Sequence, residues 1–275
     1  MDGVYLISKR VGESMGQLVE RFAGELGIDT KVTPVTFAGR LDPLAEGLCI
    51  LLVGSFVHEK EKYLAYDKAY TGTFVTGIAT DTYDIAGMPS LRVSTINRED
   101  VLEEIKNWTT YTSQVYPMYS SKPVDGKPLW VWARDGQIPP SGVPSRTIVV
   151  SESDGEYVGE ISLDELCKEV KNLLNIFPSD FRQDEIGKAW SELDGKESLI
   201  VYSFSVTASS GTYVRGLVQS LGERSVPKGT AISTISERLR NREPYGAALK
   251  TLCRQRIGPF SLSPKLQKGD IDKIV

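Results

Sequence analysis

Apolar and polar positions follow two different periods along the chain, and the change of period predicts where strands and helices lie. Residues 4–9 (VYLISK) alternate loosely and predict a strand, and the continuous apolar run 48–54 (LCILLVG) predicts a buried strand. Two stretches rich in Val, Phe, Tyr and Thr, at 69–80 and 198–209, predict half-buried strands. The polar, turn-forming stretch that begins with TDTYDIAG at residue 80 predicts an exposed loop.

Helical spacing marks four other segments. The clearest begins at Ser162, where Glu165 stands at the spacing of a capping box. Ser14 is a second candidate cap, and Gly222 is a candidate helix stop. The predicted helices are 14–25, 99–108, 162–177 and 212–223. Because strands and helices are mixed irregularly, the pattern predicts an α+β domain and not a regular βαβ array.

Composition is ordinary for a globular protein and changes this picture in one respect. The 275 residues are 40% hydrophobic and 25% charged, which suits one large domain or one domain with a small appendage. The net charge of −4 argues mildly against a nucleic-acid partner, although net charge says nothing about where Lys and Arg cluster. No apolar stretch approaches the ~20 residues that span a bilayer. We therefore expect a soluble, cytoplasmic protein.

The cysteine and histidine content excludes several kinds of chemistry. Cys49, Cys167 and Cys253 are isolated from one another and from histidine, so the sequence predicts reduced thiols and no metal site. His58 is the single histidine, and its charged neighbours indicate a solvated surface residue. A Ser-His-Asp or Cys-His arrangement would depend on that one residue. If the chain is an enzyme, carboxylate chemistry or RNA-assisted chemistry is therefore the favoured class.

Three segments carry residues that could take part in catalysis or ligand binding. Residues 37–48 contain Asp42 before Pro43, which favours an extended Asp42 but also suits an ordinary turn. Residues 68–84 contain Tyr70 and an Asp-bearing loop that lacks the remaining acidic positions of an EF-hand. Residues 209–217 place Arg215 in the first turn of a helix, where a cation opposes the helix dipole and indicates a nearby anion. A core tyrosine and a surface arginine remain alternative readings of Tyr70 and Arg215.

The order and combination of five segments resemble the TruB family of pseudouridine synthases. GRLDPLAEGLCILLVG is similar to the family's GTLDPxAxGxL motif, and SSGTYVRGLVQSLGE is similar to its GTYIRxLxxDLG segment. The other three matching segments are KAYTGTFVTGIATDTYDIAG, YPMYSSKPVDGKPLWVWARDG and GAALKTLCRQRIGPFSL. The resemblance covers about residues 3 to 263 and implies a pseudouridine synthase catalytic fold, with a mixed, mainly antiparallel sheet flanked by helices.

This resemblance implies roles for individual residues. Asp42 matches the catalytic aspartate, Tyr70 the tyrosine that stacks on the target base, and Arg215 the arginine that pairs with the aspartate. Asp42 would attack C1′ of the uridine or take a proton from its sugar, and the sequence does not decide between the two. Further candidates for substrate binding are Phe37, Gly39, Lys68, Tyr213, Lys122, Arg254 and Arg256, with Lys127 and Arg134 as additional phosphate contacts and 239–256 as a region closing the pocket.

The implied substrate is the T-arm of tRNA, with no cofactor, no metal, no membrane and no obligate protein partner. Phe37 stands where the family usually has a histidine, which leaves open a pseudouridine synthase acting on another RNA, or a non-catalytic protein that binds and remodels tRNA. The expected catalytic domain is 1–263, with a helical elaboration at 145–197 and a short tail at 264–275. The chain ends soon after its GPF, so we expect no C-terminal PUA-like domain.

Overall fold

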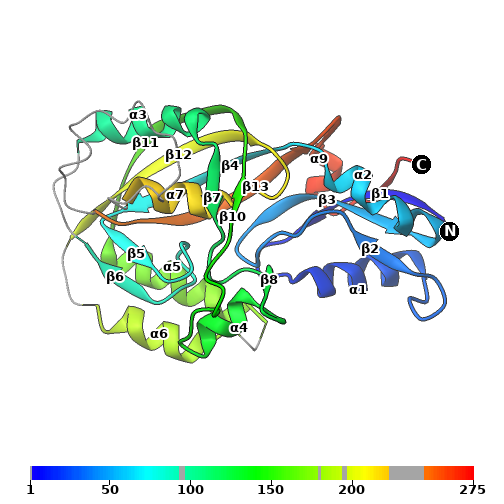
Figure 1. Cartoon of the computed structure of the whole chain (residues 1–275), viewed down its shortest axis with the longest axis horizontal. Coiled ribbons are helices and arrows are strands. Elements are labelled where there is room, and N and C mark those ends of the chain that lie inside the picture. Colours follow the sequence, from blue (N-terminus) through cyan, green and yellow to red (C-terminus); the bar gives the residue numbers. More distant parts are fainter. Residues whose placement is uncertain (1, 93–96, 179–180, 194–196, 223–244) are drawn as a thin grey trace.

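A single mixed sheet forms the centre of the computed structural model, which describes residues 2–92, 97–178, 181–193, 197–222 and 245–275 (Figure 1). Every strand pair in this sheet is antiparallel except β13 with β3. In spatial order the strands are β11 (Val150–Ser162), β12 (Ser198–Ala208), β4 (Lys68–Thr76), β13 (Ala247–Ile257), β3 (Glu46–Val53), β1 (Gly3–Lys9) and β15 (Asp272–Lys273), with β2 (Val35–Phe37) on β3 and β14 (Phe260–Ser261) on β13. The predicted α+β class and mainly antiparallel sheet are confirmed.

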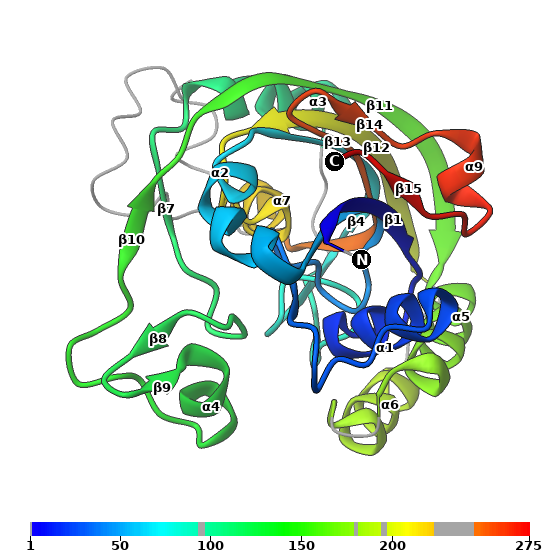
Figure 2. The ribbon, with the colours of Figure 1, turned by 90° about the vertical axis from the view of Figure 1, so that its right-hand side faces the viewer.

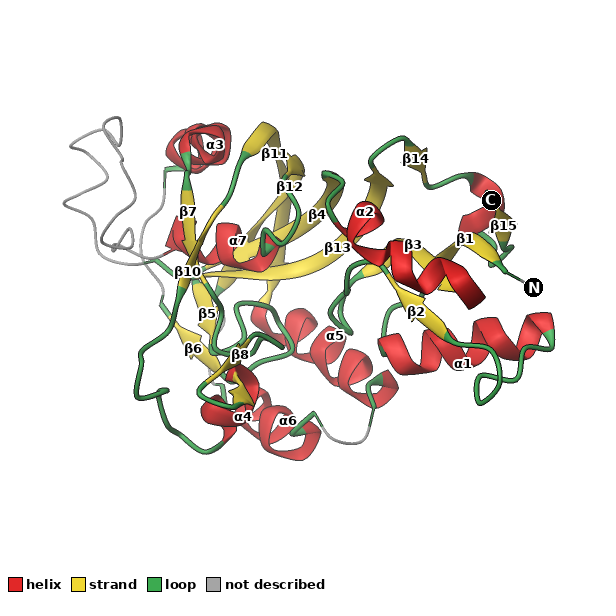
Figure 3. Ribbon diagram, turned by 45° about the vertical axis from the view of Figure 1, so that its right-hand side comes forward, coloured by secondary structure: helices red, strands yellow, loops and turns green. Residues whose placement is uncertain are grey.

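Helices and small hairpins surround this sheet. Three helices line one side of it, α1 (Met15–Leu26), α5 (Leu163–Ile176) and α6 (Gln183–Ser191) (Figure 3). A small lobe made of β8 (Pro123–Val124), β9 (Lys127–Pro128) and α4 (Leu129–Arg134) stands apart from the sheet (Figure 2). The remaining elements are η1 (Gly54–Glu59), α2 (Lys60–Leu64), β5 (Ile78–Thr80), β6 (Pro89–Leu91), α3 (Arg98–Asn107), η2 (Trp108–Thr110), β7 (Ser113–Val115), β10 (Ser145–Thr147), α7 (Val214–Gly222) and α9 (Pro264–Gln267).

The core lies on both faces of β1 and β3. In β1, Tyr5 and Ile7 pack into the main hydrophobic cluster, while Val4 and Leu6 pack into a second cluster on the opposite face. Strand β3 divides in the same way, which explains why 48–54 is apolar at nearly every position. A strand that is buried on both faces has no solvent side to carry polar residues.

The predicted elements agree with the observed ones at most places. The helices at 14–25 and 162–177 are α1 and α5, and both begin with a capping box, Ser14 with Gln17 and Ser162 with Glu165. The stretch 69–80 is not one strand, because the backbone turns at Gly77 with a φ of +95°. Its last residues pair with β6 in a separate two-stranded sheet.

Three sequence predictions about organisation are corrected. The segment 145–197 is not only helical, since β11 forms the edge of the central sheet against β12. The segment 264–275 carries α9 and β15, and β15 pairs with β1. The Asp-bearing loop is not exposed: Ile85 donates a backbone hydrogen bond to Leu249 of β13, and Asp84 is buried.

Candidate active site

Asp42 lies in the loop between β2 and β3, and two buried cations fix the backbone of that loop. The Nζ of Lys9 donates to the carbonyl oxygens of Ala45 at 2.6 Å and Pro43 at 3.3 Å. Arg254, from β13, donates from Nε to the Leu48 carbonyl at 2.6 Å and from Nη1 to the Arg40 carbonyl at 3.3 Å. Carbonyl groups that a tight turn leaves unpaired are therefore satisfied from both sides, and Asp42 is held in place.

Arg215 pairs with Asp42 and fixes its carboxylate. Its Nε donates to Asp42 Oδ2 at 2.7 Å, while Nη1 donates to the Thr82 carbonyl and Nη2 to the Tyr119 carbonyl, each at 2.7 Å. The Arg215 side chain is 4% exposed and that of Asp42 is 43% exposed. Since the guanidinium is buried and each of its three nitrogens donates a hydrogen bond, the ion pair exposes mainly its carboxylate to solvent.

The start of α7 is oriented by a side chain from β7. Gln114 accepts a hydrogen bond from the Tyr213 N–H at 2.8 Å and donates to the Tyr213 carbonyl at 2.9 Å. This double contact fixes the turn that precedes Arg215. It therefore links the position of the Asp42 partner to β7.

Asp84 is a second carboxylate close to the ion pair. Its Oδ1 accepts from the Thr82 hydroxyl at 2.7 Å and from the Ala86 N–H at 3.0 Å. Burial raises the pKa of Asp84 to about 6, although the nearby Arg215 acts in the opposite direction. Burial would lower the pKa of Arg215, but Asp42 and Asp84 more than offset this and raise it above its ordinary value.

A cavity of about 420 Å³ opens on one side of Asp42, and we call it the tyrosine cavity. Tyr70 and Tyr213 both line it, and burial raises the pKa of each, so both phenols stay neutral at ordinary pH. Asp42 is the one acidic residue among the described residues of its wall. The basic residues in this wall are Arg40, Lys60, Lys68, Arg146, Arg215 and Arg254.

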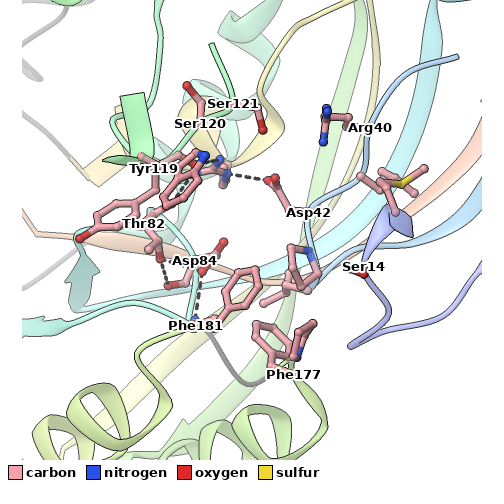
Figure 4. A pocket seen from close by; sticks show the side chains of 18 of the residues that line it. Ser14, Arg40, Asp42, Thr82, Asp84, Tyr119, Ser120, Ser121, Phe177 and Phe181 are labelled. Atoms are coloured by element: carbon pink, nitrogen blue, oxygen red, sulfur yellow. Dashed lines mark hydrogen bonds and ion pairs between the residues drawn. The ribbon is translucent and has the colours of Figure 1, made fainter. Parts of the chain in front are cut away.

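A cavity of about 410 Å³ opens on the other side of Asp42, and we call it the phenylalanine cavity (Figure 4). Its wall includes Phe177 and Phe181, which meet edge to face with ring centroids 5.5 Å apart. Asp84 also lines it. The two cavities share Arg40, Leu41, Asp42, Ser121 and Arg215. Asp42 therefore stands at the junction of two adjoining spaces.

Comparison with known proteins identifies the family of the chain. Residues 29–164 match the family model TruB_N, described as TruB family pseudouridylate synthase (N terminal domain). The chain is 27% identical over 272 residues to a tRNA pseudouridine synthase B of Syntrophus aciditrophicus, an alignment that covers 98% of this chain and 67% of that relative.

The chain belongs to the TruB family.

Two other comparisons bear on the extent of this likeness. A tRNA pseudouridine synthase B of Chlamydia muridarum is 35% identical over 140 residues, which is 50% of this chain and 56% of that relative. The fold is similar to that in a crystal structure of a Cbf5-Nop10-Gar1 complex, with a TM-score of 0.51, 15% identity, and coverage of 94% of this chain and 50% of that one. This likeness shows the fold of the chain and nothing finer.

The structure brings most of the predicted TruB site residues together. Phe37, Gly39 and Lys68 line the tyrosine cavity with Tyr70 and Tyr213. The Phe37 ring lies 5.1 Å from Arg40 Cζ and 5.5 Å from Lys60 Nζ. Phe37 therefore presents an aromatic face flanked by two cations, a combination that suits an RNA base and its phosphate.

Several predicted phosphate contacts are placed differently. Arg254 is 1% exposed, and its guanidinium donates to the carbonyl oxygens of Leu48 and Arg40. This burial contradicts the predicted direct contact of Arg254 with a phosphate. Lys68 is buried and donates to the carbonyl oxygens of Leu64 and Tyr66, and burial lowers its pKa to about 8. Both cations lie beneath the cavity, where the sheet register of β4 and β13 places them.

The other predicted cations lie outside the tyrosine cavity. Lys122 lies over the Tyr116 ring, and Arg256 donates to the Gly258 carbonyl at 3.0 Å. Lys127 pairs with Asp135 at 2.6 Å. Arg134 lines the phenylalanine cavity. Of the proposed closing region 239–256, residues 239–244 lie outside the described residues.

Sequence reasoning missed four basic residues of the site: Lys9, Arg40, Lys60 and Arg146. Lys9 ends a strand that was predicted from alternation alone, and only its buried contacts show that it supports the Asp42 loop. Arg146 lines the tyrosine cavity and donates from Nη2 to the Ser210 carbonyl at 2.7 Å. No local pattern marks Arg146, because β10 reaches the cavity through its pairing with β7.

Metal and membrane signals were also sought in the described part of the chain. There, no group of three or more His, Cys, Asp or Glu side chains is arranged to hold a metal ion. Within the same residues, no helix has the length and apolar character needed to cross a bilayer.

Proposed function

We propose that this chain is a tRNA pseudouridine synthase that isomerises a uridine of the T-arm, with Asp42 as its catalytic carboxylate. One observation carries the proposal: Asp42 lines the tyrosine cavity, and buried Arg215 donates to its carboxylate at 2.7 Å. Family membership supports the reaction class. Only the tRNA relatives themselves point to tRNA as the substrate.

The reaction breaks the bond between N1 of uracil and C1′ of ribose and forms a bond between C5 and C1′. The proton that C5 loses is balanced by the proton that N1 gains, so the nucleotide is isomerised without net oxidation. In this proposal Asp42 acts at the sugar, either by attacking C1′ or by removing a sugar proton. Arg215 orients the carboxylate for either step.

The target uridine has to leave its stack before Asp42 can reach it. Base flipping costs a few kcal/mol, and stacking on an aromatic side chain returns about 1–3 kcal/mol. Tyr70 is proposed to supply this stacking from within the cavity. Lys60, Arg40 and Arg146 carry positive charge on the same wall and would receive the adjoining phosphates. An enzyme of this kind would work in the cytoplasm, where tRNA is modified.

Incubation with an unmodified T-arm transcript, followed by mapping of pseudouridine, tests the proposal. We expect product at a T-loop uridine with the wild-type protein and loss of turnover with retained RNA binding in Asp42→Asn. Asp29→Asn is a matched control, since Asp29 is exposed and lies outside both cavities, and it should react like the wild type.

Two other outcomes separate the alternatives. Product on other RNAs but not on the T-arm would keep the chemistry and reject the T-arm as substrate. Binding without product on any RNA would favour a protein that binds and remodels tRNA, and Asp42→Asn would then leave its function unchanged.

A further inference from the structure

We propose that Gln114 of β7 is a positioning residue, which sets the catalytic geometry of Tyr213 and Arg215 through the backbone of Tyr213. This inference rests on the proposed function and adds to it a residue that lines neither cavity. The start of α7 lies beside β7 (Figure 1). Because β7 and β10 form a sheet of their own, apart from the central one, the geometry of the site depends on a contact made from outside the central sheet.

The side-chain amide of Gln114 matches both backbone groups of one residue. Its Oε1 accepts from the Tyr213 N–H at 2.8 Å, and its Nε2 donates to the Tyr213 carbonyl at 2.9 Å. The Tyr213 carbonyl also accepts from the Leu217 N–H at 3.2 Å, at the beginning of α7. Gln114 is only 8% exposed, so without its amide these two backbone groups would lose partners that water does not readily replace.

The chain around Gln114 is itself fixed. β7 pairs with β10, and Gln114 stands directly opposite Arg146 in that pairing. Two residues further along, the Tyr116 ring meets the Tyr213 ring edge to face, with centroids 5.8 Å apart. The segment from Gln114 to Tyr116 therefore contacts Tyr213 at both its backbone and its ring.

Arg215 needs an accurately placed backbone. Its guanidinium donates at 2.7 Å to each of three groups from different segments, the Asp42 carboxylate and the carbonyl oxygens of Thr82 and Tyr119. A planar guanidinium has its donors in a rigid fork, so it reaches three fixed acceptors from few backbone positions. The residue that Gln114 holds lies two positions before Arg215 in the chain.

The turn before α7 has a second anchor that does not depend on Gln114. Ser209 donates its N–H to the Val149 carbonyl at 2.8 Å, and its hydroxyl accepts from the Val149 N–H at 3.0 Å. Loss of the Gln114 amide therefore releases only the end of the turn that carries Tyr213 and Arg215. We expect such a protein to fold and to bind RNA, but with a slower chemical step, since a misplacement of about 1 Å can lower a rate about a hundredfold.

The first test replaces the amide by a carboxyl group of the same shape. The ionised form of Gln114→Glu repels the Tyr213 carbonyl oxygen, whereas the protonated form can accept and donate as the amide does. Relative to the wild type at the same pH, we expect its kcat to be at least about tenfold lower near pH 8 and to recover towards about pH 5. Gln114→Met keeps the length of the side chain without either hydrogen bond, so its kcat should stay low at every pH. The KM for RNA should change less than about twofold in both variants.

The second test reaches the same contact from α7. A Cβ on Gly216 would lie 2.8 Å from Gln114 Nε2, so Gly216→Ala displaces the amide, although alanine is otherwise favoured in a helix. We expect Gly216→Ala to lower kcat about tenfold in the wild type. In a Gln114→Ala background, which leaves room for the added methyl group, it should lower kcat no further.

Gln255 supplies matched control variants. Its amide is also partly buried and hydrogen-bonded, donating to Thr71 Oγ1 at 2.9 Å, and it lines neither cavity. Gln255→Glu and Gln255→Met should keep the kcat of the wild type at each pH. Denaturant unfolding gives the folded fraction of every variant, so that kcat is compared per folded molecule and a loss of stability is not mistaken for a slower reaction.

Three results would overturn the inference while the proposed function stands. They are a wild-type kcat in Gln114→Met, a defect of the Gln114 variants in KM alone, and a defect of Gln114→Glu that protonation does not relieve. Equal losses from Gly216→Ala in both backgrounds would also overturn it, because the methyl group would then act elsewhere. Absence of product from every RNA with the wild type would reject the proposed function itself.

Discussion

Arg146 has an incompletely satisfied guanidinium in the wall of the tyrosine cavity. One nitrogen donates to the Ser210 carbonyl, while its buried Nε has no hydrogen-bond partner among the described residues. A charged hydrogen bond contributes about 1.5–3 kcal/mol. We therefore expect Arg146→Gln to raise the KM for RNA at least about tenfold and to change kcat less than about twofold.

Steady-state kinetics with the T-arm transcript check this prediction. Arg98→Gln is the control, since Arg98 pairs with Glu160 on the surface and lines neither cavity. A fall in kcat at unchanged KM would instead assign Arg146 to the chemical step.

Asp84 predicts a pH dependence of stability. Its pKa rises from the ordinary value of 3.8 to about 6 in the folded protein, so the folded state holds the proton more tightly. The stabilisation of the folded state by protonated Asp84 is fully present below pH 3.8 and is lost as pH rises through about 6. The difference of about 2 pKa units corresponds to at most about 3 kcal/mol.

Asp84→Asn removes this titration while keeping an oxygen that can accept from Thr82 and Ala86. Urea unfolding at pH 4 and pH 7 measures the result. Between pH 4 and pH 7 the wild type should lose the stabilisation that Asp84 provides, and the variant should not. The free energy of unfolding of the variant, measured relative to the wild type, should therefore be higher at pH 7 than at pH 4. An unchanged difference between the two proteins would show that Asp84 does not titrate in this range.

At the scale of elements, the parallel contact of β13 with β3 depends on Gly47. This residue has a φ of +104°, and a Cβ there would lie 2.5 Å from the Arg254 carbonyl oxygen. Gly47→Ala should therefore lower the free energy of unfolding by about 2 kcal/mol or more and displace the Asp42 loop. Activity should fall with it.

Gly24→Ala is the matched control, and it should raise the free energy of unfolding where Gly47→Ala lowers it. Gly24 lies inside α1, and no atom lies within 4 Å of its built Cβ. Alanine in a helix interior is favoured over glycine by about 0.5–1 kcal/mol, so this variant should be more stable. Denaturant unfolding of both variants checks the pair, and equal effects would refute the steric argument.

At the scale of the whole molecule, a net charge of −4 coexists with a locally basic cavity. Association with RNA depends on this local cluster, because counterions are released where Lys and Arg meet phosphate. We expect RNA affinity to fall steeply with salt, with a log–log slope of roughly 0.7–0.9 for each phosphate contacted.

Lys60→Ala should reduce this slope by roughly one phosphate contact, since Lys60 lines the tyrosine cavity beside Phe37. Lys265→Ala, on exposed α9, should leave the slope unchanged. Filter binding between low and physiological salt measures both. A slope that neither variant changes would mean that RNA binds elsewhere on the surface.

The amino-acid pattern by itself determined the local elements and the family. Alternation predicted β1, a continuous apolar run predicted β3, and helical spacing predicted α1 and α5, because the residues of each element themselves define which of its faces are buried. The motif around Asp42 and the one around Arg215 indicated the family independently of any contact between them. Their pairing, across 173 positions of the chain, was expected from resemblance and is observed in the structure.

Only the tertiary structure decided which charges are available to a substrate. Lys9 and Arg254 are buried because carbonyl groups distant in sequence accept their hydrogen bonds, and no local pattern reveals such acceptors. Asp84 is buried for the same kind of reason, since its loop pairs with β13. The phenylalanine cavity likewise exists because Phe177 and Phe181 line the same space as Asp42. Burial of a side chain and the lining of a cavity depend on residues from several elements at once. The spacing of residues along one element therefore does not determine them.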